Sequence, residues 1–413
     1  MELIKIISTK NYIIKAGGIA DYILGASGKS ATNCPADRIY LEDGRIAAIT
    51  KATDTPYKFT WPTRQTISLD LHHLTLMPPL VDCHVHLALD GRDFSAARER
   101  WDQPGELDNE VGAQLCDTIR HGILAVRDGG DRPGIALRYR NRITDGELTG
   151  PVIRASGYAL RKPQKYGSFL GRGTPAEMLD NALEQLTRQK VDQVKVLVSG
   201  VVSFKEYSRV GPPQYTAEEL AAIVAGAHVR GLRVMAHASS DKAVALAVQA
   251  GADTIEHGYF LSRETLKLMA GKGIAWIPTV IPVAAQLTAR PPHSGDRHAS
   301  QHSDSVIART VDRQLSMINE AHALGVTLGV GTDAGASGVR HGYSYWRELE
   351  LYRQAGLAPR EIIRCATINS ARILNLNWGR IAPGRSAAMI AVSGDPLENI
   401  DSLQNIAYAF QPE

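Results

Sequence analysis

Two histidines, two positions apart, end an apolar run near residue 80. Residues 76–90 read LMPPLVDCHVHLALD and contain His84 and His86. Because side chains alternate between the two faces of a β-strand, both imidazoles should project from the tip of one buried strand. Neutral imidazoles at this spacing can ligate zinc or a similar metal. The pair alone does not decide between a metal site and two polar residues at a strand end.

Four more titratable side chains lie in or directly after later apolar runs. Lys195 lies inside VKVLVSG, His237 ends VMAH, His257 lies in TIEHG and Asp333 ends LGVGTD. Each of these residues also has a purely structural explanation when it is considered alone. A histidine can be part of the protein core, an aspartate can cap a helix N-terminus, and a lysine at the rim can bury its stem while its ammonium group stays exposed. A buried ammonium must meet an anion or lose its charge, because desolvation is costly. Together these residues predict a metal centre made of His84, His86, Lys195, His237, His257 and Asp333.

The elements that position these residues alternate regularly from residue 76 onward. Short apolar runs begin there and recur at residues 123–126, 152–155, 194–198, 232–236, 254–256, 274–277 and 326–330. Most are followed by helix-like stretches, for example residues 176–190, 217–230 and 241–250, and Thr216 suits a helix N-cap. Eight such units predict an α/β fold, a parallel (β/α)8 TIM-like barrel whose C-terminal rim carries the chemistry.

The two ends of the chain read as β structure. Two alternating runs flank Asp43-Gly44, a strong hairpin signal, and residues 388–392 and 405–410 are strand-like. We therefore expect residues 1–75 and 376–413 to form one small composite β-sandwich, with the barrel at 76–375 inserted between them. Gly28-Lys-Ser lacks the earlier glycine of a phosphate-binding loop, so a plain loop is expected there.

Composition narrows the class of protein. The chain has 413 residues, 44% hydrophobic and 22% charged, with a net charge of +3 and no basic run interleaved with aromatics, which argues against nucleic acid as a partner. No apolar stretch is long enough to span a membrane. Four scattered cysteines form no disulfide framework, and the N-terminus lacks signal-peptide features. We expect a cytoplasmic protein with a small-molecule partner. A homo-oligomer is left open.

Two long segments should form loops at the mouth of the barrel and shape the substrate pocket. Residues 281–305 are rich in Pro, His, Ser and Arg and suggest a lid, with His293, His298 and His302 solvated. Residues 158–174 contain a basic stretch that either meets an anionic substrate or, as we favour, is simply solvated: Arg161, Lys162, Lys165 and Tyr166.

Several motifs resemble the amidohydrolase superfamily over nearly the whole chain, near imidazolonepropionase-related proteins and metal-dependent dipeptidases. These are DCHVH at 82–86, LAVRDGG at 124–130, VKVLVSG at 194–200, VMAHA at 234–238, TIEHG at 254–258, GTDAG at 331–335 and WRELELYRQAGLAP at 346–359. The loop after residue 160 lacks the Gly-Gly-His stretch of the dipeptidases. The resemblance therefore does not imply a dipeptidase activity for this chain. His341 is similar to a family position near the substrate and, with Tyr166, is a candidate substrate contact.

The resemblance implies a binuclear zinc site and hydrolysis of a C–N amide or cyclic amide bond by a metal-bound hydroxide. His84 and His86 would bind one Zn²⁺, His237 and His257 the other, and a Lys195 carbamate would bridge them. Asp333 would complete the first site and act as the catalytic proton carrier. The alternatives are a mononuclear deaminase or imidazolone hydrolase, which needs no bridging lysine, and a catalytically inactive scaffold homologue.

Overall fold

The computed structural model describes residues 1–20, 38–287 and 297–413 of the chain. These residues form two compact units. Unit 1 comprises Met1–Val81, Asp117–Leu124 and Ala358–Glu413, and unit 2 comprises Asp82–Cys116 and Ala125–Leu357. The Gly28-Lys-Ser stretch lies outside the described residues. No described helix is both long and apolar enough to cross a membrane. The domain bounds expected from the sequence, 1–75 with 376–413 for the composite domain and 76–375 for the barrel, remain a prediction.

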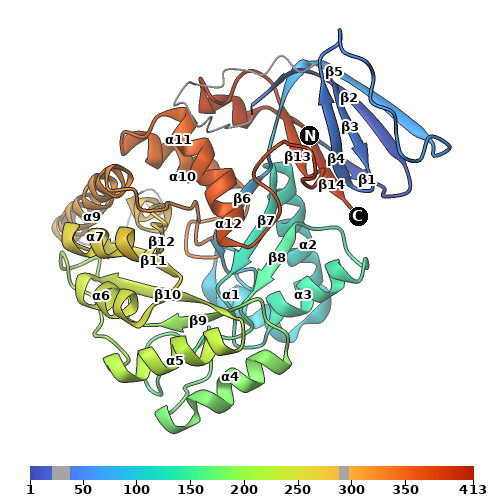
Figure 1. Cartoon of the computed structure of the whole chain (residues 1–413). Helices are drawn as coiled ribbons and strands as arrows, with labels where there is room; N and C mark the ends of the chain where they lie inside the picture. The colour runs from blue at the N-terminus through green and yellow to red at the C-terminus, as the bar shows by residue number, and fades with distance from the viewer. Residues whose placement is uncertain (21–37, 288–296) are drawn as a thin grey trace. The chain divides into compact units, whose positions relative to one another are not determined.

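Unit 1 contains a seven-stranded sheet built from both ends of the chain (Figure 1). Its strands run in the order β1-β14-β13-β5-β2-β3-β4. Their bounds are β1 (Glu2–Ile6), β2 (Asn11–Ile19), β3 (Arg38–Glu42), β4 (Arg45–Thr50), β5 (Thr66–Met77), β13 (Met389–Val392) and β14 (Ile406–Pro412). The N-terminal strand β1 pairs in parallel with the C-terminal strand β14, with Ile4 opposite Phe410. Apolar side chains from both chain ends therefore share one core.

The hairpin predicted at residues 43 and 44 is confirmed. Strands β3 and β4 pair antiparallel, and Asp43 and Gly44 have φ angles of 51° and 68°. Two successive residues with positive φ form the type of tight turn whose twist matches a hairpin, and Asp-Gly accepts that backbone at low cost. The C-terminal helices of unit 1 are α11 (Pro359–Arg364), η4 (Cys365–Asn369), α12 (Ser370–Ile373) and η5 (Ile400–Gln404).

Unit 2 carries most of two parallel sheets. Their orders are β6-β7-β8 and β12-β11-β10-β9. The bounds are β6 (Leu80–Val85), β7 (Ile123–Asp128), β8 (Val152–Ala155), β9 (Gln193–Leu197), β10 (Arg233–Ser240), β11 (Thr254–Phe260) and β12 (Ala275–Ile277). Isolated bridges join Leu160 to Val196 in β9 and Trp276 in β12 to Leu328. Seven of the eight predicted β segments are therefore strands.

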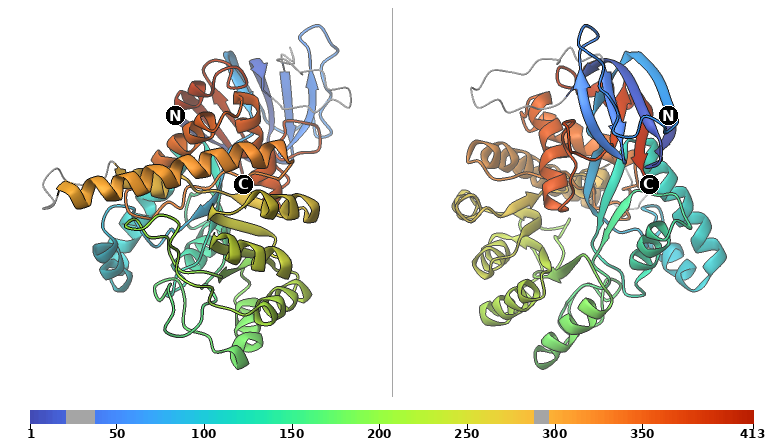
Figure 2. Two further views of the ribbon diagram at one scale, coloured as in Figure 1. Left: turned by 90° about the vertical axis from the view of Figure 1, so that its left-hand side faces the viewer. Right: turned by 45° about the vertical axis from the view of Figure 1, so that its right-hand side comes forward.

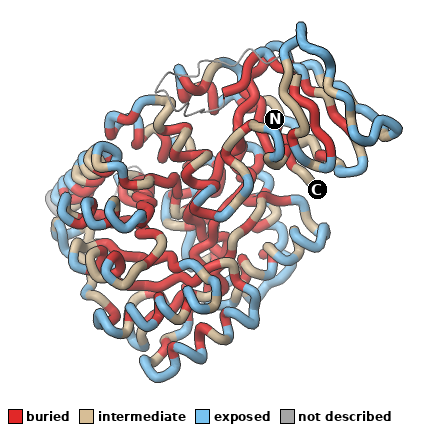
Figure 3. The backbone as a smooth tube through the Cα atoms, viewed as in Figure 1, coloured by how far each residue is buried: buried red, intermediate tan, exposed pale blue. Residues whose placement is uncertain are grey.

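Helices cover the outer side of the second sheet, where α4 to α7 lie outside β9–β12 (Figure 1). The helices outside unit 1's C-terminal group are α1 (Phe94–Glu99), η1 (Arg100–Asp102), α2 (Pro104–Arg120), α3 (Ile135–Thr144), η2 (Ala176–Met178), α4 (Leu179–Arg188), α5 (Ala217–Val229), α6 (Asp241–Ala250), α7 (Arg263–Lys272), α8 (Ile281–Ala284), η3 (Ala285–Leu287), α9 (Arg297–Ala323) and α10 (Tyr343–Gln354). Thr216 caps α5 and forms a reciprocal capping box with Glu219, as its sequence predicts. Figure 3 shows the strands of unit 2 largely buried and the outer helix turns exposed.

Two expectations about local structure are wrong. Residues 326–330 do not form a regular strand, because only Leu328 makes a ladder bridge there. The segment 281–305 is not one long loop: α8 and η3 occupy its start, and its end belongs to α9, a 27-residue helix seen as a long rod in Figure 2. The polar start of α9 has no apolar periodicity, so the sequence pattern concealed that this helix begins before its buried Val306 and Ile307.

Candidate metal centre

His84 and His86 project from the end of β6 into the interior of unit 2. His84 is fully buried and His86 nearly so. The Nδ1 atom of His86 lies 3.2 Å from the carbonyl oxygen of Gly130. Burial lowers the pKa of His84 well below its usual value, and nearby Lys195 adds to that effect. His84 is therefore neutral at physiological pH, which is the form of imidazole that binds a metal.

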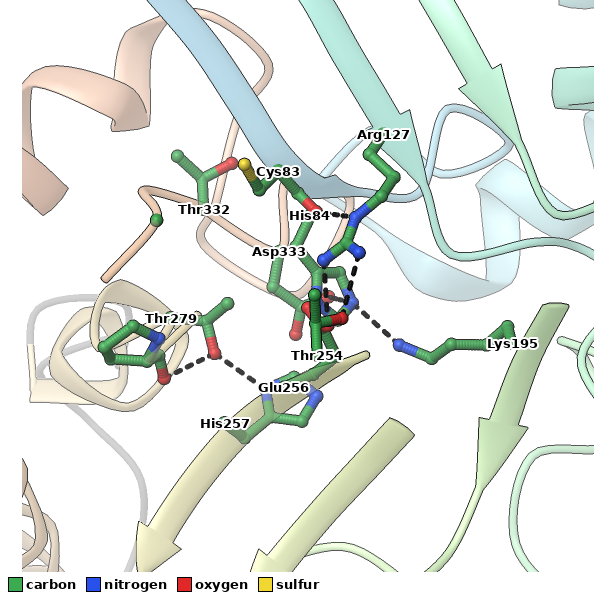
Figure 4. A network of polar contacts seen from close by, with 12 residues as sticks. Cys83, His84, Arg127, Lys195, Thr254, Glu256, His257, Thr279, Thr332 and Asp333 are labelled. Atoms are coloured by element: carbon green, nitrogen blue, oxygen red, sulfur yellow. Dashed lines mark hydrogen bonds and ion pairs between the residues drawn. The ribbon is translucent and has the colours of Figure 1, made fainter. Parts of the chain in front are cut away.

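A buried ionic network orients the His84 ring (Figure 4). Glu256 on β11 accepts a hydrogen bond from His84 Nδ1 at 2.8 Å and one from the Arg127 guanidinium at 2.8 Å. Thr254 also donates its hydroxyl to Glu256, and Arg127 donates to the Cys83 carbonyl oxygen at 2.7 Å. This arrangement places the His84 proton on Nδ1 and leaves Nε2 with a free lone pair facing the other candidate ligands.

Asp333 reaches the same point from the turn that follows residue 330. Its Oδ1 lies 3.3 Å from His86 Nε2 and 3.5 Å from His84 Nε2. Tetrahedral ligands about 2.1 Å from a zinc ion lie roughly 3.4 Å from one another, so these spacings suit three ligands of one ion. Among the described residues, His84, His86 and Asp333 form the one group of three whose ligand atoms all lie within 4.8 Å. The donor set fits a divalent metal.

The carboxyl group of Asp333 is held in its ionised form. Burial alone would raise its pKa, but the adjacent His84 and His86 lower the pKa of Asp333 below the ordinary value. Asp82 fixes the turn that carries it: this carboxyl group accepts hydrogen bonds from the Thr332 hydroxyl at 2.6 Å and from the Thr332 backbone N–H at 3.0 Å. Burial raises the pKa of Asp82 to about 7.

Lys195 points to this group from the middle of β9. It is fully buried, and its Nζ lies 3.2 Å from His84 Nε2. Burial lowers the pKa of Lys195 to about 8, although Glu256 and Asp333 oppose the shift. The amine of Lys195 therefore loses its proton more readily than that of an ordinary lysine. An uncharged amine is the form that reacts with carbon dioxide.

His237 in β10 and His257 in β11 complete the predicted set. Their ring centroids are 4.5 Å apart, and the ring of His257 is 5.0 Å from that of His84. The Nδ1 atom of His257 lies 2.7 Å from the Thr279 hydroxyl. Burial lowers the pKa of His237 to about 4 and that of His257 well below its usual value. All six predicted residues therefore lie together.

Backbone strain is concentrated at two of these residues. His257 and Asp333 have φ angles of 70° and 56°, in the left-handed region that non-glycine residues rarely adopt. The left-handed backbone at His257 interrupts the simple alternation of side chains within β11. Glu256 and His257 are neighbours in sequence, yet Glu256 contacts His84 Nδ1 while His257 lines the adjoining cavity.

A cavity of about 510 Å³ opens over the centre. Five of the six candidate ligands line it, and the rest of its wall is mostly apolar. Tyr166 lies on this wall with its ring 5.7 Å from the ring of His237, and its role as a substrate contact stays a prediction. His341 is not among the lining residues. It is buried and hydrogen-bonded to the Leu89 carbonyl oxygen at 2.9 Å, a position that supports the loop after β6.

The basic loop at residues 161–166 is largely used for structure. Arg161 is buried and donates to the carbonyl oxygens of Gly171, Lys162 and Lys165. Lys162 pairs with Glu219 at 2.7 Å. The side chains of Arg161 and Lys162 are therefore bound to groups of the chain itself.

Arg127 and Glu256 were missed as functional residues from the sequence. The sequence does contain a signal for them: like Lys195, each is a charged residue inside an apolar strand. Two opposite charges in different buried strands indicate a buried ion pair, but the sequence does not say which strands are close enough to form it.

Comparison with known proteins gives the family. The sequence model of the amidohydrolase family matches residues 75–412. The chain belongs to the amidohydrolase family. It is 24% identical over 401 residues to an ochratoxinase of Aspergillus niger, covering 89% of this chain and 79% of the relative. An imidazolonepropionase of Paracoccus denitrificans is 24% identical over 391 residues, covering 84% of this chain and 86% of the relative.

The structural comparison agrees. A crystal structure of a Xaa-Pro dipeptidase with bound methionine superposes with a TM-score of 0.78 at 26% identity, covering 97% of this chain and 98% of that one. This likeness gives the amidohydrolase a TIM-barrel-like α/β fold. The resemblance inferred from the sequence motifs is confirmed, and the protein is a hydrolase acting on carbon–nitrogen bonds. The family acts on small-molecule substrates.

Proposed function

We propose that this amidohydrolase uses a binuclear zinc centre to cleave an amide or cyclic amide bond of a small molecule. His84, His86 and Asp333 would hold one ion, His237 and His257 the other, and a carbamate on Lys195 would bridge them. The observation that carries the proposal is the position of Lys195, fully buried with its Nζ 3.2 Å from the His84 Nε2 atom. A carbamate would convert this buried cation into an anion among neutral imidazoles.

The chain's own residues supply the remaining chemistry. When bound, divalent cations would contribute Lewis acidity, which lowers the pKa of water and polarises a carbonyl oxygen. Asp333, ionised and lining the cavity, would accept a proton from the attacking water and return it to the leaving nitrogen. Glu256 and Arg127 would keep His84 in the required tautomer, and the buried setting of the histidines would keep them neutral.

We extend the proposal to the closed barrel, the composite domain and the location of the enzyme. The two parallel sheets and the bridges at Leu160 and Leu328 are consistent with an eight-stranded (β/α)8 barrel. We also propose that the seven-stranded sheet of unit 1 forms the composite β-sandwich expected from the two chain ends, and that the enzyme acts in the cytoplasm.

Metal counting combined with a substrate screen tests the proposal. The metal content of the purified chain is measured while N-acyl amino acids, dipeptides and cyclic amides are offered with zinc. We expect two equivalents of metal and turnover of at least one compound class. Asp333→Asn should keep the fold and most of the metal but lose nearly all turnover. Asp145→Asn, at an exposed helix end, is the matched control and should behave as wild type.

A mononuclear hydrolase is the second candidate, because His84, His86 and Asp333 alone already satisfy the geometry of one ion. One equivalent of metal that does not change on Lys195→Met would favour it over the binuclear centre. Full metal loading with no hydrolysis across the whole screen would contradict both and favour the scaffold reading.

A further inference from the structure

The cavity over the metal centre is walled by aromatic and aliphatic side chains. Phe94 and Phe169 meet edge to face with ring centroids 5.0 Å apart, and Tyr166 lies 6.0 Å from Phe169. Phe204 and Leu170 extend the same surface. Rings packed in this way offer faces and edges to another ring or to a branched alkyl group, and they gain free energy when such a group displaces water.

Cationic groups are scarce on this wall. Of the described residues that line the cavity, Lys195 is the one Lys or Arg, and it faces the histidines rather than the apolar surface. A substrate carboxylate placed against the phenylalanines would lose its hydration without gaining a partner among these residues, which is unfavourable.

One buried hydroxyl on the wall has no partner within the described chain. Ser239 is fully buried and lines the cavity, and its Oγ forms no hydrogen bond, although its backbone N–H donates to Ser199 Oγ at 3.1 Å. It lies two residues after His237 on β10, and both side chains line the same cavity. A buried hydroxyl without a partner carries a desolvation cost, which a bound polar group would remove.

We propose that the substrate is an amide with a bulky aromatic or branched apolar group and no free carboxylate, and that Ser239 hydrogen-bonds a neutral polar atom next to the scissile bond. The apolar group would lie against Phe94, Phe169 and Phe204. This inference rests on the proposed function, because it names the substrate class of the same site. It separates this chain from an enzyme that recognises the charged ends of a dipeptide.

Matched substrates test whether the preferred substrate is apolar and uncharged. The zinc-loaded enzyme is given N-phenylacetyl-phenylalanine and its N-methylamide, which differ in charge, and N-acetyl-phenylalanine N-methylamide, which lacks the acyl ring. We expect kcat/KM for the neutral phenylacetyl compound to exceed both others by at least about 10-fold. Equal or faster cleavage of the carboxylate, or of the acetyl compound, overturns the proposal.

Two serine variants test the role of Ser239. Ser239→Ala should raise KM for the neutral phenylacetyl compound several-fold and leave the melting temperature unchanged or higher, because no hydrogen bond within the protein is lost. Ser156→Ala is the control: this buried hydroxyl donates to the Asp128 carbonyl oxygen at 2.8 Å, so its loss should lower the melting temperature without changing the substrate preference. An unchanged KM in Ser239→Ala overturns the role of Ser239.

The two levels of the proposal fail separately. If no compound in the wider amide screen is hydrolysed, the proposed function fails, and binding of the same three compounds to the zinc-loaded protein, followed by calorimetry, still decides the substrate class. Turnover that prefers small or carboxylate-bearing amides leaves the proposed function intact and overturns the inference.

Discussion

Glu256 is the residue on which the orientation of His84 depends. One of its carboxylate oxygens faces the imidazole and the other faces Arg127 and Thr254. A glutamine can offer an oxygen to only one side. If its oxygen stays with Arg127, its amide nitrogen meets His84 Nδ1 and disfavours the tautomer that leaves Nε2 unprotonated.

Glu256→Gln should therefore weaken zinc binding by about 10- to 100-fold, the usual effect of losing a group that orients a metal ligand. Affinity is measured by competition with a chromophoric chelator. Glu348→Gln is the matched control, since Glu348 is also fully buried but contacts the backbone N–H groups of Val280 and Ile281. Equal zinc affinities in the two variants would refute the orienting role of Glu256.

At the scale of elements, Glu348 on α10 anchors the start of α8. Burial raises its pKa to about 8, against 4.5 when unfolded. Between these values the unfolded chain loses the proton first, so this group's contribution to stability falls as pH rises, by up to about 1.4 kcal/mol per pH unit.

Glu348→Gln carries no such titration. Relative to wild type, its melting temperature should therefore improve steadily from pH 5 to pH 8, on top of a constant loss from the missing hydrogen bond. Thermal denaturation in a series of buffers measures the difference. A difference that does not change with pH would show that Glu348 is ionised in the folded protein across this range.

The loop after β7 approaches the ligands closely at Gly129. A Cβ atom there would lie 2.7 Å from the His86 ring, so the imidazole would have to move. Gly129→Ala should reduce zinc affinity, whereas Gly271→Ala, in α7 with nothing within 4 Å, should stabilise the protein slightly. Chelator competition and melting temperature are measured for both. Wild-type zinc affinity in Gly129→Ala would contradict this account.

The sequence predicted elements where local signals agreed. Residues 152–155 and 241–250 were predicted to the residue as strand and helix, because apolar pattern and neighbouring caps coincide there. The interval 326–330 was not, since its apolar run is the same whether it forms a full strand or a single bridge at Leu328. The sequence was sufficient to predict that the six titratable residues come together, because each follows or lies within a strand of the predicted parallel barrel. The pairing of Arg127 with Glu256 could not, because strand proximity is a tertiary property.

At the scale of the whole molecule, all six candidate ligands lie in unit 2 and none in the sheet of unit 1. Metal binding stabilises the folded state by mass action, about 4 kcal/mol when free metal exceeds its Kd a thousandfold. Chelation should therefore raise amide hydrogen exchange around His84 and Asp333 while leaving β2 to β5 unchanged. Mass spectrometry of exchanged peptides measures this. A uniform increase across both units would mean that metal stabilises the chain as one cooperative body.

The parallel pair of β1 and β14 has a consequence for biosynthesis. β14 lies between β1 and β13, so β1 has no neighbour in its sheet until residues 406–412 have been synthesised. Nearly four hundred residues of intervening chain are synthesised in the meantime, and β1 must wait with its backbone groups bonded to water. Completion of unit 1 therefore waits for β14, and nascent chains stalled short of residue 406 should expose an edge that is open to proteases and chaperones.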